Sequence, residues 1–83
     1  MDKIKVYGAD WCEDTKRTRA LLDNLDVAYD YVNIEEDEPA ASWVKEQNDG
    51  RERKPTVKIG ARVLSVPDDG ELESALREQG LVR

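Results

Sequence analysis

Residues 4–25 read IKVYGADWCEDTKRTRALLDNL, and this stretch decides the fold. Its first part, Ile4 to Tyr7, alternates in character and ends at Gly8, which is typical of a short strand. From about Cys12 to Leu25, apolar and small residues recur at helical spacing. A strand therefore leads through a short loop into a helix, and the one cysteine of the chain lies where that helix begins.

The remainder of the sequence predicts five further elements in a clear order. Residues 29–34 have the character of a second strand, and a helix follows from about Pro39 to the Asn48-Asp49-Gly50 turn, with Ala40, Trp43, Val44 and Gln47 on its inner face. Residues 56–59 and 62–65 predict a hairpin around Gly60-Ala61, and a last helix opens at residues 67–70 and stops at Gly80. The order is β-α-β-α-β-β-α.

This order predicts one four-stranded mixed sheet flanked by helices. Two strands joined through a helix pair in parallel with a right-handed crossover, whereas a hairpin pairs antiparallel. Eighty-three residues provide one hydrophobic core, so we expect residues 1–83 to form a single domain.

The amino-acid composition limits which partners and which kinds of site this protein can have. The formal net charge is −6, which argues against nucleic acid or an anionic membrane as partner. No stretch is apolar enough to span a membrane, so we expect a cytoplasmic protein, and we expect it to be a monomer. With one cysteine and no histidine, the chain cannot form an internal disulfide, and we expect no metal site.

The position of Cys12 favours a reactive thiol. Unpaired N–H groups and the dipole at a helix start favour the thiolate, whereas the negative charges of Asp10, Glu13 and Asp14 oppose it. The sequence therefore leaves open whether the pKa of the Cys12 thiol is lowered or raised. Thr15 lies on the same helix face, where its hydroxyl could donate to the thiolate or could bond to the preceding turn. The sequence does not choose between these two interpretations.

Two segments carry a resemblance to a known family. Residues 6–12, VYGADWC, resemble the strand and active-site loop of glutaredoxins, closest to the mycoredoxin branch, and residues 54–60, KPTVKIG, resemble the cis-proline segment of that family. The resemblance extends from Lys3 to about Leu81. It implies a thioredoxin-like fold with Cys12 as the nucleophile.

The resemblance also implies roles for other positions. Pro55 would be the cis-proline beside Cys12, and the backbone of Lys54 would pair with a bound thiol peptide. Trp11 would flank or shield the thiol site. Asp68 and Asp69 lie where glutaredoxins bind the charged amino-acid end of glutathione, although Asp68 is at least as well explained as a helix N-cap.

Three departures from the family pattern bear on activity. Thr15 replaces the second cysteine of the usual C-x-x-C, which leaves only a monothiol cycle. Ala9 stands where a lysine is frequent, and Lys54 replaces a small or aliphatic residue. Lys54, Arg51 or Arg53 could supply the charge that is missing at Ala9.

We therefore expect a monothiol thiol–disulfide oxidoreductase that acts on protein mixed disulfides, with mycothiol or glutathione as co-substrate and no tightly bound cofactor. The alternative is a redox-inactive protein-binding module that retains the fold. An iron–sulfur carrier is less favoured, because Glu13 and Asp14 replace the glycine and phenylalanine of that subgroup.

Overall fold

The computed structural model describes residues 4–82. It contains four strands and three helices in the predicted order. The elements are β1 (Ile4–Gly8), α1 (Glu13–Asn24), β2 (Asp30–Asn33), α2 (Glu38–Gln47), β3 (Thr56–Ile59), β4 (Arg62–Ser65) and α3 (Asp69–Glu78). In this part of the chain, no helix combines the length and the apolar character needed to cross a membrane.

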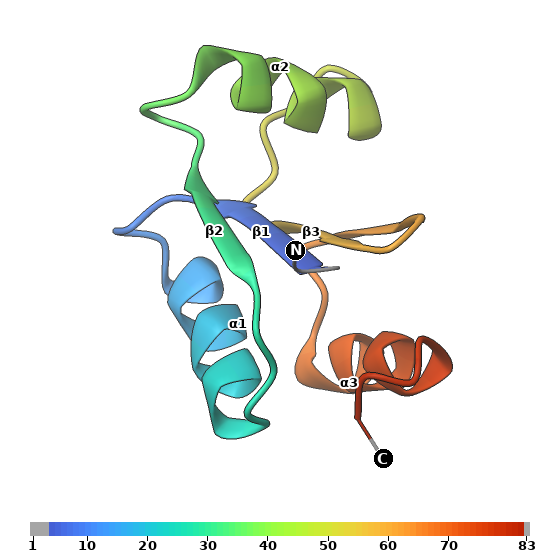
Figure 1. Ribbon diagram of the computed structural model, residues 1–83. Helices are drawn as coiled ribbons and strands as arrows, with labels where there is room; N and C mark the ends of the chain where they lie inside the picture. The colour runs from blue at the N-terminus through green and yellow to red at the C-terminus, as the bar shows by residue number, and fades with distance from the viewer. Residues whose placement is uncertain (1–3, 83) are drawn as a thin grey trace.

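The four strands form one mixed sheet in the order β2-β1-β3-β4, which confirms the predicted fold class. The central strand β1 pairs in parallel with β2, where Val6 faces Tyr31, and antiparallel with β3, where Val6 faces Val57. Strands β3 and β4 form the antiparallel hairpin. Helices α1 and α3 cover one face of the sheet and α2 covers the other (Figure 1).

Alternating side chains of β1 serve two separate hydrophobic clusters, because successive residues of a strand point to opposite faces. Ile4 and Val6 belong to the larger cluster, under α1 and α3. Tyr7 belongs to the smaller cluster, under α2, where its ring lies 4.6 Å from that of Trp43. A strand buried on both faces fixes the loop that follows it, and that loop carries Cys12.

Local side-chain contacts set the helix starts. The Asp37 carboxylate accepts a hydrogen bond from the Ala40 N–H at 3.0 Å and so caps α2, with a proline in the first turn. The prediction for the end of α2 was wrong in one detail. Gln47 is exposed, whereas Asn48 is buried, because the backbone leaves helical geometry at Asn48 and turns its side chain toward the sheet.

Candidate active site around Cys12

Cys12 is the N-cap residue of α1, as the sequence predicts. Its backbone N–H donates to the Ala9 carbonyl at 3.1 Å, and its carbonyl accepts from the Lys16 N–H at 3.0 Å, which anchors both sides of the residue. No side chain caps the helix at this position. The first backbone N–H groups of α1 therefore have no side-chain acceptor at this end of the helix, and the positive end of the helix dipole next to the partly exposed thiol favours negative charge.

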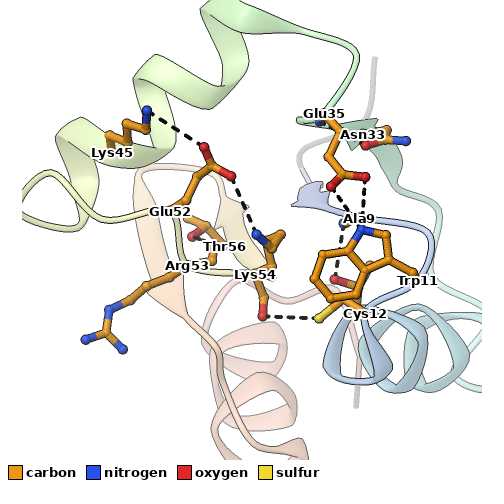
Figure 2. A network of polar contacts seen from close by, with 11 residues as sticks. Ala9, Trp11, Cys12, Asn33, Glu35, Lys45, Glu52, Arg53, Lys54 and Thr56 are labelled. Carbon is orange, nitrogen blue, oxygen red and sulfur yellow. Dashed lines mark hydrogen bonds and ion pairs between the residues drawn. The ribbon is translucent and has the colours of Figure 1, made fainter.

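The thiol meets the segment that precedes β3. The Sγ of Cys12 donates a hydrogen bond to the Lys54 carbonyl oxygen at 3.7 Å, although 42 residues separate them (Figure 2). The Lys54–Pro55 peptide bond is cis, as the resemblance implied, and Pro55 is buried. The Val66 N–H donates to the Pro55 carbonyl at 2.8 Å, so the hairpin fixes this segment beside the sulfur.

Trp11 lies next to Cys12 and beside Lys54 (Figure 2). Its indole is 60% exposed, and its Nε1–H donates to both carboxylate oxygens of Glu35 at 2.9 Å. The Lys54 ammonium lies 5.3 Å from the centre of the indole ring, within the range of a cation–π contact. Figure 2 shows the indole held between these two charged side chains, next to Cys12.

The Lys54 side chain is only 18% exposed and is already paired. Its Nζ lies 3.5 Å from Glu52, and the other Glu52 oxygen lies 3.8 Å from Lys45 on α2. Arg53, a second candidate for the missing charge, points away from Cys12 (Figure 2). Arg51 and Arg53 line a hollow at the end of α2, so Lys54 is the candidate cation whose side chain lies next to Trp11 and Cys12.

The sequence places three carboxylates near Cys12 whose negative charge disfavours a thiolate, and in the structure each of them contacts a neighbouring donor. These contacts offset part of their negative charge, and they hold the carboxylates to fixed partners. Glu13 lies 3.3 Å from Lys16, Asp14 lies 2.9 Å from Arg17, and Asp10 accepts a 2.7 Å hydrogen bond from the Tyr31 hydroxyl.

The Tyr31 hydroxyl fixes the active-site loop to β2. Burial, followed by the hydrogen bond to Asp10 and the charge of Asp10, raises the pKa of Tyr31 to about 12, although the Arg19 charge lowers it. The Arg19 guanidinium lies 3.9 Å from the centre of the Tyr31 ring and covers it. Asp10 is thereby positioned by a protonated phenol across the neutral pH range.

The family of this chain follows from comparison with known proteins. The glutaredoxin family model matches residues 4–64, which include β1, Cys12 and the Lys54–Pro55 segment. The chain belongs to the glutaredoxin family. It is 41% identical over 59 residues to mycoredoxin 1 of Corynebacterium glutamicum, a match that covers 70% of this chain and 71% of that protein.

Solved structures agree with this glutaredoxin fold. A thioredoxin-like protein superposes with a TM-score of 0.82 and 26% identity, covering 93% of this chain and 97% of its own. A glutaredoxin from Archaeoglobus fulgidus superposes with a TM-score of 0.76 and 21% identity, covering 93% and 88%. Glutaredoxins are thiol–disulfide oxidoreductases.

In this glutaredoxin, Thr15 occupies the position of the second family cysteine. Its side chain is 1% exposed, and its Oγ1 accepts from the Ala9 N–H at 3.5 Å. Within residues 4–82, no hydrogen bond joins Thr15 to Cys12. The hydroxyl faces the end of β1, an arrangement that neither sequence interpretation anticipated.

Arg17 joins the start of α3 to the first turn of α1, because it contacts Asp14 at 2.9 Å and donates to the Pro67 carbonyl at 3.3 Å. The Asp68 carboxylate accepts from the Glu71 N–H at 2.8 Å, and the Glu71 carboxylate accepts from the Asp68 N–H at 3.3 Å, which completes a capping box. Asp69 lies 3.6 Å from Arg17 of α1. The prediction that Asp68 is the N-cap of α3 is therefore confirmed. A role of Asp68 and Asp69 in binding the small thiol stays a prediction.

Sequence analysis missed Asn48 as a support of the site. Its Nδ2 donates to the Val44 carbonyl at 2.7 Å and to the Thr56 Oγ1 at 3.1 Å, and the Ser65 hydroxyl donates to its Oδ1. Thr56 in turn donates to the Arg53 carbonyl at 2.8 Å, across the Lys54–Pro55 segment. A polar residue at the end of a helix gave no sign that it would turn inward.

A metal is not indicated by the side chains. Across residues 4–82, histidine, cysteine and acidic residues nowhere gather in a group of three or more that could hold an ion. Cys12 has the Lys54 carbonyl and Trp11 as its neighbours instead. A partly exposed thiol of this kind can take part in thiol–disulfide exchange, and binding of a small thiol along Lys54 stays a prediction.

Proposed function

We propose that this glutaredoxin is a monothiol oxidoreductase that uses Cys12 to remove small thiols from protein mixed disulfides. The observation that carries the proposal is the pairing of a partly exposed helix-start thiol with the Lys54 carbonyl, 3.7 Å away. No other cysteine exists in the chain, and the buried Thr15 occupies the position of a resolving thiol. A dithiol cycle is therefore closed to this protein.

The cycle has two exchanges. The Cys12 thiolate attacks the small-thiol sulfur of a protein mixed disulfide, so that a Cys12–small-thiol disulfide forms and the protein thiolate leaves and takes up a proton. A second small-thiol thiolate then attacks the outer sulfur of that disulfide. Cys12 leaves as a thiolate, and the oxidised small thiol departs as a symmetric disulfide. In each exchange one disulfide bond breaks and one forms, so the cycle consumes one free small thiol and releases one protein thiol.

Mycothiol is the proposed co-substrate ahead of glutathione. The 41% identity to mycoredoxin 1 supports this choice. Ala9 is fully buried, so it offers no side chain to the carboxylate of a bound thiol. Lys54 is the charged alternative, but Glu52 already accepts its ammonium.

A coupled assay tests the proposal. Pure reduced protein is mixed with a model peptide that carries mycothiol in a mixed disulfide, free mycothiol and the matching reductase, and consumption of the reductant is followed. A parallel series uses glutathione and glutathione reductase. We expect turnover with mycothiol that disappears in Cys12→Ser, because serine lacks a thiolate for exchange.

The control separates this function from the alternative. Cys12→Ser keeps the size and position of the side chain, so its circular dichroism spectrum should match that of the wild type. Absence of turnover with both thiols, in a folded wild-type protein whose Cys12 is alkylated no faster than an unfolded cysteine peptide, would favour a redox-inactive protein-binding module.

A further inference from the structure

The charged side chains around Lys54 pair with one another beside Cys12. A chain of contacts runs along one side of Cys12. It leads from Lys45 to Glu52, Lys54, the Trp11 indole and Glu35. The chain contains two cations and two carboxylates, so its net charge is zero. Each of its two ammonium groups already contacts a carboxylate, so neither is free to bind the carboxylate of a ligand.

A hollow of about 490 Å³ adjoins this chain of contacts, between the end of β2, α2 and the segment before β3. Its lining shares Glu35, Lys45 and Glu52 with the chain of contacts and adds Glu38 and Ser42. Three carboxylates against one ammonium give the hollow a negative balance. A carboxylate entering it would be repelled, whereas uncharged hydroxyl or amide groups would find acceptors in Glu35 and Glu52.

We infer that Glu52 is a specificity-determining residue, which masks the Lys54 ammonium and so selects small thiols whose ends are uncharged. The inference rests on the proposed exchange at Cys12. Glutathione, a thiol with two carboxylates, would need the Lys54 ammonium that Glu52 holds. A thiol with hydroxyl-bearing, uncharged ends would leave the ion pair intact.

The Glu52→Gln variant tests this, because it keeps the size of the side chain and removes its charge. The probes are mixed disulfides of one model peptide with glutathione and with glutathione diethyl ester, which share the same sulfur and differ in their carboxylates. Stopped-flow or quenched mass spectrometry measures the single exchange rate at Cys12. The quantity compared between variants is the ratio of the glutathione rate to the ester rate.

We expect Glu52→Gln to raise this ratio about threefold to fivefold at low salt, the scale of one unit charge acting near a surface site, and less at high salt. Glu46→Gln is the matched control, since Glu46 is an exposed α2 carboxylate outside the chain of contacts, and it should leave the ratio unchanged. In a Lys54→Met background, Glu52→Gln should give a smaller rise, because only the direct repulsion by Glu52 is then removed and no ammonium is unmasked.

The outcomes separate the two proposals. If wild-type Cys12 exchanges with neither mixed disulfide, the proposed function fails. If exchange proceeds but the ratio stays the same in Glu52→Gln, or moves equally in Glu46→Gln, only the role of Glu52 is overturned. A rise of the same size without Lys54 would also overturn it, because Glu52 would then act by direct repulsion alone and not by masking the ammonium.

Discussion

The side chain of Thr15 occupies the space in which a side chain at Gly8 would lie. A β-carbon added to Gly8 would come within 2.5 Å of the Thr15 Oγ1 and 2.6 Å of its Cγ2. The end of β1 and the first turn of α1 are therefore in direct contact. This contact sets the position of the loop that joins them, and Cys12 is part of that connection.

Gly8→Ala should destabilise the protein by about 1–3 kcal/mol, because the added methyl group overpacks a closed site. Urea unfolding followed by circular dichroism measures the change. Thr15→Ala removes both clashing atoms, so the double variant should be more stable than the sum of the two single changes predicts. Additive effects would show that the two side chains do not share this space.

Thr15→Cys should convert the monothiol site into a dithiol site. Residues three apart on a helix lie on one face, and in this family that position holds the second cysteine of C-x-x-C. Mild oxidation should then yield a monomer that lacks two hydrogens and reacts with no alkylating reagent, as mass spectrometry would detect. Thr18→Cys, a buried thiol further along α1, is the control and should form no internal disulfide.

Asn48→Ala should lower the free energy of unfolding by about 1–3 kcal/mol, because buried polar groups lose their partners. Its loss should also loosen the Lys54–Pro55 segment, through Thr56, and change the alkylation rate of Cys12. Gln47→Ala, at the exposed neighbouring position, should change neither quantity. An unaltered alkylation rate in a destabilised Asn48→Ala variant would confine Asn48 to a structural role.

Ionisation of Tyr31 should lower the free energy of unfolding of the protein in alkaline solution. Its pKa is about 12 in the folded protein against 10.0 for an unperturbed tyrosine, so the folded state retains a proton that the unfolded chain releases. The stabilising contribution is complete below pH 10 and is lost as pH rises toward about 12. The difference in urea midpoint between wild type and Tyr31→Phe should shrink across that window, and Asp10→Asn should weaken the dependence. A constant difference would contradict the raised pKa.

Two variants at Asp68 distinguish a helix-capping role from a role in binding the small thiol. Asp68→Ala should cost about 1 kcal/mol of stability, because the Glu71 N–H loses its acceptor. Asp68→Ser keeps a capping oxygen and should restore most of that loss. If the KM for the small thiol rises in both variants while stability falls only in Asp68→Ala, Asp68 also takes part in binding. An unchanged KM in the serine variant would leave it as a cap alone.

Much of the fold was predictable from local patterns. Alternation in residues 4–7 and helical spacing after Cys12 arise from contacts between near neighbours, so the chain order of elements and the helix-start position of Cys12 could be read directly. The hairpin bounds at residues 56–59 and 62–65 agree with the structure, because Gly60 supplies the positive φ that the turn needs. The placement of Gln47 on the inner face was wrong and the burial of Asn48 was missed, since the period of a helix says nothing about the residue that follows its end.

The sequence by itself determined that one thiol lies at the start of a helix and that no second thiol can resolve its disulfides. Only the tertiary structure decided which groups meet that thiol. The Lys54 carbonyl is 42 residues away from Cys12 in the chain, and Glu35 is 24 residues from Trp11. Such contacts depend on how the sheet brings β1 beside β3 and on which partner each charged side chain finds. The contact of Glu52 with Lys54 joins residues two apart in the chain, whereas the contact of Glu52 with Lys45 on α2 depends on how the fold places that helix.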